Sequence, residues 1–173
     1  LLAAWALLVG TRAIRGEEER GLLEQWLSAG IPRGRWLAVR TVGVALAVTT
    51  VGLLIGVAAA VGARLGGGML PARALLGACA ALAGLTLACF GIALIAAEVV
   101  GTRRGAVVLG GACLAGLHLL NSLPRSADRV PPSRWLSPFY WYERSNPLTP
   151  GGRLDVPAAV ALAAMGVVLA ALA

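Results

Sequence analysis

The sequence contains no lysine, and all 15 of its basic residues are arginine. A Walker-type phosphate-binding loop requires a Gly-Lys-Ser/Thr sequence, in which the lysine reaches the β- and γ-phosphates. The three consecutive glycines at 66–68 therefore do not form such a loop. This absence excludes ATP hydrolysis by that mechanism, so any ATP must be bound by another chain.

Histidine and cysteine are scarce as well. His118 is the single histidine, so these residues form neither a histidine-based metal site nor a catalytic triad. Its place near the end of an apolar run favours a packed or interfacial side chain over a role in proton coupling. Cys79, Cys89 and Cys113 lie in apolar segments without a CxxC pair, which predicts neither a disulfide framework nor a metal site.

Common catalytic motifs are absent. The sequence has no GxSG, no HExxH and no paired aspartates, since Asp128 and Asp155 stand alone. We therefore expect no catalytic residue, no metal and no cofactor. A membrane-embedded hydrolase or lipid transferase is the least favoured alternative, because it needs a reactive cluster in or beside the apolar segments.

Charged residues make up only 13% of the chain, against roughly 25% in soluble domains, whereas 58% of the residues are hydrophobic. The 23 glycines suit helices that pack closely in a bilayer. The net charge of +7 does not indicate nucleic-acid binding, because the arginines flank apolar segments, where they suit lipid headgroups. The composition predicts an integral membrane protein in contact with the lipid bilayer.

Apolar runs occupy most of the chain, and about 20 such residues suffice to cross a bilayer. We predict an all-α, polytopic transmembrane bundle with complete spans at residues 36–63, 74–97 and 105–123. Residues 1–10 would be the end of another span, and residues 156–173 the beginning of the last. The polar residues Thr11, Arg12 and Arg15 would mark the exit of the first run into water.

Residues 16–35, which we call the 16–35 loop, differ sharply from the runs around them. Their carboxylates lie where the first turn of a short amphipathic helix would favour them, at Glu17, Glu18 and Glu19. The apolar face of that helix would consist of Leu22, Leu23, Trp26 and Leu27. Gly30 and Pro32 would end it, and Arg33 follows. The loop is too short and too charged to span a membrane.

Residues 124–155 are rich in proline and predict a structured loop that touches the membrane, with a short helix around residues 132–143. This segment contains a run of four aromatic side chains, Phe139, Tyr140, Trp141 and Tyr142. Such runs are typical of an aromatic belt at the membrane–water interface, which we favour over a substrate site.

Charge gives a small preference for one orientation. The gaps at 11–40 and 98–104 lie on one side of the membrane and contain eight arginines, against seven on the other side. The eight are more densely packed, which favours a cytoplasmic position for the 16–35 loop under the positive-inside rule.

Two stretches resemble type-2 ABC exporter permeases. The 16–35 loop, GEEERGLLEQWLSAGIPRGR, is similar to the cytoplasmic loop between the second and third spans of that family. Residues 136–148, LSPFYWYERSNPL, resemble the stretch before the last span in bacterial members. The order of spans also agrees, if the sequence is a fragment that begins in the second span and ends in the sixth. Both ends of the sequence indeed lie in apolar runs.

The resemblance implies a membrane subunit of an ATP-driven exporter in the bacterial plasma membrane. It would work as a homo- or heterodimer of permeases with separate ABC ATP-binding subunits, and residues 124–155 would be external. The 16–35 loop would be a cytoplasmic coupling element that docks on the ATP-binding subunit. The residues to which the resemblance gives this role are Glu17, Glu18, Glu19, Leu22, Leu23, Glu24, Trp26, Leu27, Pro32 and Arg33. Family members move drugs, antibiotics, lipids and polysaccharides, and the small apolar residues of this chain favour a hydrophobic compound.

Two alternatives remain open. From periodicity alone, the 16–35 loop is an amphipathic helix that only anchors the chain to lipid. An ion- or proton-coupled secondary transporter would need charged or polar residues at mid-membrane. The spans contain no such charge, since Glu98 lies at the end of one, within reach of Arg103 or Arg104.

Overall fold

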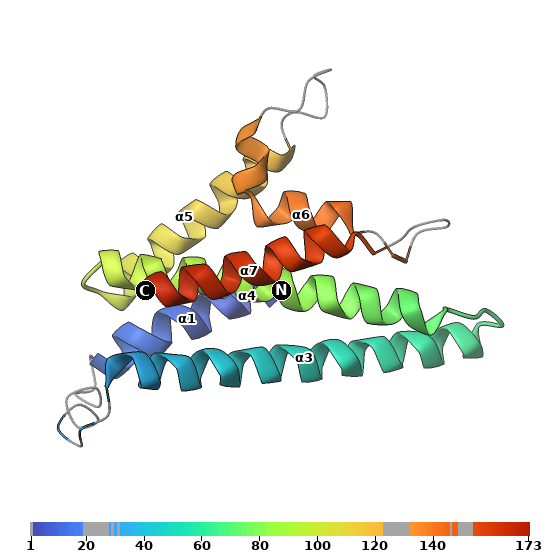
Figure 1. The fold of residues 1–173 in the computed structure, drawn as a ribbon, viewed down its shortest axis with the longest axis horizontal. Coiled ribbons are helices and arrows are strands. Elements are labelled where there is room, and N and C mark those ends of the chain that lie inside the picture. The colour runs from blue at the N-terminus through green and yellow to red at the C-terminus, as the bar shows by residue number, and fades with distance from the viewer. Residues whose placement is uncertain are drawn as a thin grey trace.

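The structure is a computed structural model that describes residues 2–18, 28, 30, 32–122, 132–145, 147–148 and 154–173. These residues form helices joined by short connections, and the part of the chain that is described contains no strand, which confirms the all-α prediction. The elements are α1 (Leu2–Glu18), α3 (Arg33–Leu65), α4 (Ala72–Val99), α5 (Arg103–Ser122), the 3₁₀ helix η2 (Pro132–Leu136), α6 (Pro138–Arg144) and α7 (Val156–Leu172) (Figure 1).

Among the described residues, α3, α4 and α5 are long and apolar enough to cross a membrane. They contain the predicted spans 36–63 and 74–97 entirely, and all but the last residue of 105–123. The helix α7 is apolar but shorter, at 17 residues. The helices α3, α4 and α5 can cross a bilayer, and a helix satisfies its own backbone hydrogen bonds there. The arrangement is therefore that of a polytopic membrane protein.

The helix α4 lies at the centre of the bundle, and it contacts α1, α3, α5, α6 and α7. Half of its 28 residues are buried, and most of these are alanine or glycine. Small side chains let neighbouring backbones approach closely, which is the main source of attraction between helices in lipid. The central position of α4 thus follows from its composition.

The contact between α4 and α7 is especially close. A Cβ atom added at Gly91 would lie 2.6 Å from the Leu169 Cβ, and one added at Gly166 would lie 2.8 Å from the Leu87 carbonyl carbon. Real Cβ atoms do not approach other atoms so closely, so glycine is required at both positions. These two glycines bring the α4 and α7 backbones together.

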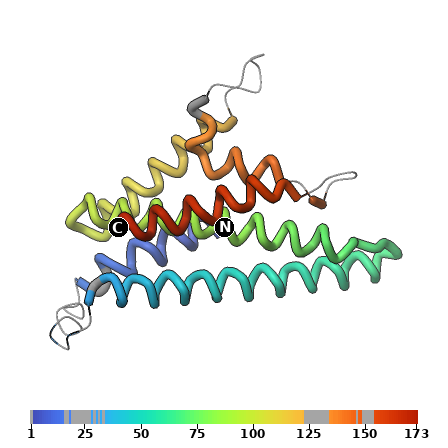
Figure 2. The backbone as a smooth tube through the Cα atoms, in the orientation of Figure 1, coloured from blue at the N-terminus to red at the C-terminus, as the bar shows by residue number. Residues whose placement is uncertain are grey.

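The helix α3 runs beside α4 along one edge of the bundle (Figures 1 and 2). A hydrogen bond joins the two helices, in which the Cys79 thiol of α4 donates to the Gly52 carbonyl of α3 at 3.0 Å. Elsewhere α3 exposes large apolar side chains, among them Val39, Val42, Leu46, Leu54 and Val57. In a membrane protein such a face meets lipid or another chain.

The turn between α3 and α4 lies between the predicted spans 36–63 and 74–97. Gly67 adopts φ 76°, a left-handed conformation that costs glycine little. Its amide donates to the Arg64 carbonyl at 3.1 Å, and the Gly68 amide donates to the Ala63 carbonyl at 2.8 Å. This pair of bonds is a Schellman motif, which satisfies the last carbonyls of α3 before the chain reverses.

The prediction for the end of the first helix is wrong. The chain stays helical to Glu18, beyond the predicted end at residue 10, so Glu17 and Glu18 form the last turn of α1 and not the first turn of a new helix. Thr11 is fully buried. Its hydroxyl is satisfied within the helix, where it donates to the Leu7 carbonyl at 2.9 Å. Thr11 and Arg15 are satisfied by protein groups, whereas Arg12 is exposed on the same helix.

Candidate functional site

One end of the bundle collects the ends of α1 and α4 and the beginnings of α3 and α5 (Figure 2). We call it the Arg15 end. The Arg15 Nε donates to the Ala97 carbonyl at 2.6 Å, and its Nη2 donates to the Glu98 carbonyl at 3.2 Å. Its Nη1 contacts the Glu18 carboxylate. Arg15 thus caps the last turn of α4 from α1, where carbonyls lack helical partners and the helix dipole favours a cation.

The coupling residues predicted from the sequence divide into three groups. Glu18 is half-buried and pairs with Arg15 of the same helix. Glu17 lies in the last turn of α1, Pro32 is exposed directly before α3, and Arg33 is the first residue of α3. The others lie outside the described residues, namely Glu19, Leu22, Leu23, Glu24, Trp26 and Leu27.

The boundary of the 16–35 loop with α3 also differs from the prediction. The helix begins at Arg33 and not at residue 36. Pro32 occupies the N-cap position in an extended conformation, with φ −67° and ψ 141°, and the helix starts at the residue after it. Gly30 adopts φ 77°, the left-handed conformation that a helix-ending glycine uses. The side chain of Trp36 packs against the core in the first turn of α3.

A second polar assembly lies away from the Arg15 end. It consists of η2 and α6, residues 132–145, and we call it the strap. Hydrogen bonds from two residues of the strap attach it to α5. The Arg134 Nη2 donates to the Asn121 backbone carbonyl at 2.9 Å, and the Ser137 hydroxyl donates to the Leu117 carbonyl at 2.9 Å. The Asn121 carbonyl lies in the last turn of α5, where carbonyls have no helical partners, and the Leu117 carbonyl lies about one turn earlier. The predicted short helix around 132–143 is therefore present as η2 and α6.

The other end of the strap is attached to the beginning of α7. The Arg144 Nε donates to the Asp155 carboxylate at 2.9 Å, and the Ser145 hydroxyl donates to the Asp155 backbone carbonyl at 3.3 Å. The Arg144 Nη1 also donates to the Tyr140 hydroxyl at 3.5 Å. This hydrogen bond is the larger cause, and the contact with Asp155 the smaller, of a pKa for Arg144 above its ordinary value. Asp155 also accepts from the Ala158 amide at 3.1 Å, so it caps α7.

The four aromatic residues predicted as an interfacial belt, Phe139, Tyr140, Trp141 and Tyr142, all belong to α6. Phe139 meets the exposed His118 of α5 edge to face, with ring centroids 5.1 Å apart. The Trp141 indole donates to the Trp135 carbonyl at 2.8 Å, which connects α6 to η2. His118 is therefore packed on an aromatic ring, in agreement with the reading favoured from the sequence.

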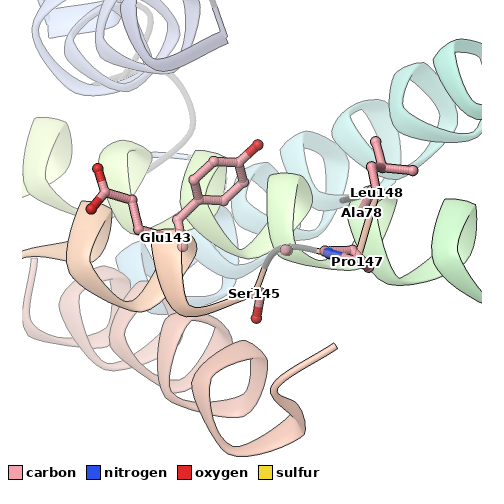
Figure 3. Close-up of a pocket in the computed structure, with 7 residues that line it drawn as sticks. Ala78, Glu143, Ser145, Pro147 and Leu148 are labelled. Carbon is pink, nitrogen blue, oxygen red and sulfur yellow. The ribbon is translucent and has the colours of Figure 1, made fainter. Parts of the chain in front are cut away.

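A cavity of about 320 Å³ separates the strap from α4. Tyr142, Glu143 and Ser145 form its wall on the strap side, and Ala78 and Ala81 form its wall on α4. Figure 3 shows Glu143 at one edge, with Ser145 and Pro147 beyond it and Leu148 beside Ala78 at the other edge. This volume lies at the lower limit of pockets that bind small organic molecules.

The sequence matches, over residues 1–173, the family described as the C-terminal domain of the multidrug efflux system permease Rv1217c. The chain belongs to this permease family. No curated protein and no solved structure matches it. The match agrees with the bundle of apolar helices and supports a transport role for this membrane protein.

Sequence reasoning missed three of the contacts that organise this permease. It treated Arg15 as a residue that enters water, and Asp155 as an isolated aspartate. A signal for Asp155 was present, because an aspartate one residue before a Val-Pro pair is typical of a helix N-cap. No sequence signal connects Arg15 with Ala97 or Arg134 with Asn121, since these contacts depend on how the helices pack.

Proposed function

We propose that this chain is the membrane subunit of an ATP-driven exporter of the type-2 ABC class, in the bacterial plasma membrane. The observation that carries the proposal is the match of all 173 residues to a domain of a multidrug efflux permease. These 173 residues contain no lysine for a Walker loop, and the proposal assigns ATP hydrolysis to a separate subunit. The chain itself would transport and not catalyse.

The coupling element in this proposal is the 16–35 loop. The geometry of the Arg15 end supports this role, because α1 leads directly into the loop and the Arg15 side chain donates to two carbonyls in the last turn of α4, those of Ala97 and Glu98. A displacement of the loop by the ATP-binding subunit would therefore move α1 and the end of α4 together. Since α4 contacts the other helices, the displacement would reach the whole bundle.

A second permease copy completes the proposed assembly. The apolar side chains exposed along α3 support a contact with lipid or with another chain, but they do not distinguish between them. A homo- or heterodimer would place two coupling elements on two ATP-binding subunits. The transported compound would be hydrophobic, because the surfaces of the spanning helices are apolar.

The proposal is tested by co-purification. The full-length permease is co-expressed with ATP-binding subunits encoded by neighbouring genes, and the wild type is compared with the double variant Glu24→Arg, Trp26→Ala. We expect the ATP-binding subunit to co-purify with the wild type and to be lost from the variant, while membrane insertion is unchanged. The matched control is Glu143→Arg, Trp141→Ala, which makes the same two changes in the strap and should leave the association intact.

Each contrary result points to a different alternative. If no ATP-binding subunit associates with the wild type, the exporter proposal fails and transport driven by an ion gradient becomes the next candidate. If the subunit associates equally with the variant in the 16–35 loop, that loop only anchors the chain to lipid. If the strap variant alone loses the subunit, the proposed orientation is wrong.

A further inference from the structure

A groove with an apolar lining runs between residues 53–60 of α3 and residues 72–79 of α4, and its volume is about 220 Å³. Its floor is formed by three small residues that are buried or half-buried, Gly56, Ala60 and Cys79. Its rims are formed by exposed side chains, among them Leu53, Val57 and Leu76. We call it the α3–α4 groove. Because it lies in two helices that can span a membrane, it faces the acyl chains of the bilayer.

Close packing of the two helices fixes the floor of the α3–α4 groove. The Cys79 thiol donates to the Gly52 carbonyl at 3.0 Å, and a Cβ added at Gly56 would lie 3.0 Å from the Cys79 Sγ. Beyond the other end of the groove, the turn closes the pair with the hydrogen bonds from Gly67 and Gly68 described above. Binding in the groove therefore requires no rearrangement of α3 and α4, which lowers its cost.

The α3–α4 groove ends at two arginines. Arg64 lies four residues after Ala60 and continues the face of α3 that lines the groove, whereas Arg73 directly follows Ala72, which lines it from α4. Both arginines are exposed. Within the described part of the chain, neither guanidinium has a hydrogen-bond or ion-pair partner. The turn that carries them lies at the end of α3 opposite the Arg15 end (Figure 1).

No carboxylate of α3 or of the first turns of α4 neutralises this pair, because the sequence contains no acidic residue between Glu24 and Glu98. The beginning of α4 adds the positive end of its helix dipole to the charge of the two arginines. Arginine binds phosphate oxygens through parallel N–H donors, and basic residues at a membrane surface attract anionic headgroups. An apolar groove that ends at two such side chains matches both parts of an anionic lipid.

We propose that the α3–α4 groove and its two arginines bind one anionic phospholipid. The phosphate would lie between the Arg64 and Arg73 guanidinium groups, and one acyl chain would lie in the groove against Gly56 and Ala60. This proposal does not depend on the exporter function. Only the choice of leaflet depends on the proposed orientation, because a cytoplasmic 16–35 loop would place the headgroup in the outer leaflet.

Photoactivatable lipids locate the site. Phosphatidylglycerol and phosphatidylcholine with the same diazirine-labelled acyl chain are added in trace amounts to phosphatidylcholine nanodiscs that contain the full-length permease, and labelled peptides are mapped by mass spectrometry. We expect the phosphatidylglycerol probe to label residues 53–60 and 72–79 roughly tenfold more than the phosphatidylcholine probe. Residues 108–116 of α5 are the internal reference, which both probes should label equally. Unlabelled phosphatidylglycerol should displace its probe, whereas sn-glycerol 3-phosphate should not.

Variants test the two parts of the site separately. Arg64→Gln and Arg73→Gln should each lower labelling by the phosphatidylglycerol probe several-fold, and the double variant should reduce it to the level of the phosphatidylcholine probe. Arg104→Gln removes an exposed arginine at the beginning of α5 and should have no effect. Ala60→Leu fills the groove and should lower labelling, whereas Ala58→Leu makes the same change at an exposed position outside the lining and should not.

Three results would overturn the proposal. Equal labelling by the two probes would show ordinary contact with the surrounding lipid, and unchanged labelling of the double arginine variant would reject these residues as the headgroup site. Displacement by sn-glycerol 3-phosphate would show that the turn binds a free phosphate and not a lipid. Thermal unfolding in the same nanodiscs confirms that each variant is folded. None of these results depends on whether an ATP-binding subunit associates, so this proposal and the exporter proposal fail separately.

Discussion

The Arg144 guanidinium donates to the Asp155 carboxylate at 2.9 Å and thereby joins the last turn of α6 to the residue that caps α7. Asp155 uses its two carboxylate oxygens for different purposes, since Oδ2 accepts from Arg144 and Oδ1 accepts from the Ala158 amide. The strap and the last helix are therefore connected through one side chain. The two contacts differ in the free energy that they contribute, and substitutions at Asp155 separate them.

Asp155→Ala should lower the free energy of unfolding by about 1 kcal/mol, because the first turn of α7 loses its N-cap. Asp155→Asn should have a much smaller effect, since asparagine caps a helix as well as aspartate and only the ion pair is lost. That pair is exposed on the Arg144 side, where 49% of the side chain is accessible, and exposed pairs contribute little. Unfolding in mixed micelles, followed by circular dichroism, measures both changes. An asparagine variant as unstable as the alanine variant would show that the ion pair is the main contact.

Arg15→Gln should destabilise the Arg15 end by roughly 1–3 kcal/mol, the range for carbonyls that lose a charged donor. Arg15 binds carbonyls 82 and 83 residues away in sequence, so the loss would separate α1 from the end of α4. Hydrogen exchange at the amides of residues 94–99 reports this separation directly. The matched control is Arg12→Gln on the same helix, because Arg12 is exposed.

The same pair of variants tests the proposed coupling. In the assembled exporter, Arg15→Gln should retain ATP hydrolysis while transport falls several-fold, because the subunit still docks but α4 no longer follows α1. Arg12→Gln should leave the ratio of transport to hydrolysis unchanged. A parallel fall of both activities in Arg15→Gln would instead indicate simple loss of folded protein.

Gly91→Ala should be strongly destabilising, although alanine favours helices. The added Cβ would lie 2.6 Å from the Leu169 Cβ and 3.1 Å from the Gly166 carbonyl oxygen, so the α4 and α7 backbones would have to separate. Overpacking of this kind costs about 1–3 kcal/mol. Gly43→Ala on α3 is the control, because nothing lies within 4 Å of its added Cβ, and helix propensity predicts a small gain. The fraction of folded protein after heating in detergent distinguishes the two.

Asn121→Asp should stabilise the protein. Asn121 is fully buried, and the structure shows no hydrogen-bond partner for its Nδ2 or for the Arg134 Nε. Nε shares one edge of the planar guanidinium with Nη2, which already contacts the Asn121 Oδ1 at 3.3 Å. An aspartate at position 121 removes the Asn121 Nδ2 donor and offers a carboxylate oxygen to the Arg134 Nε. The free energy of unfolding should rise by about 1–2 kcal/mol.

The outcome for Asn121 has two informative controls. Asn121→Leu removes the acceptor as well and should leave Arg134 with a poorer partner, so it should be less stable than the wild type. Ser122→Ala changes the next residue, whose hydroxyl only donates back to the His118 carbonyl at 2.9 Å, and should be nearly neutral. An aspartate variant that is less stable than the wild type would indicate that the unpaired donors have a partner in the membrane-embedded protein.

The long helices of the fold were predictable from the sequence because they depend on composition alone. The predicted apolar spans correspond to α3, α4 and α5, and Gly67 with Pro71 defines the turn between α3 and α4. The Pro/aromatic segment also predicted the short helices of the strap. These features are local, so each can be recognised without knowledge of the neighbouring helices.

The contacts that organise the candidate site were not predictable in the same way. Arg15 was expected in water because polar residues usually mark the end of a span, but the exposed carbonyls of α4 offer it a protein environment. A single sequence does not show that the last turn of α4, which contains Ala97, lies beside Arg15 of α1. The cavity beside Glu143 likewise depends on the distance between the strap and α4, which packing decides.

The glycines that bring α4 and α7 together also limit how the bundle can move. Two helices whose backbones touch where a methyl group has no space do not slide past each other without a clash. We therefore expect α4 and α7 to move as one rigid unit when the bundle changes shape. The helices that can shift relative to this unit would be α3, which meets α4 along one edge, and α5, which diverges from α4 toward the strap (Figure 1). A compound that fixes α3 or α5 against α4 and α7 would stop transport.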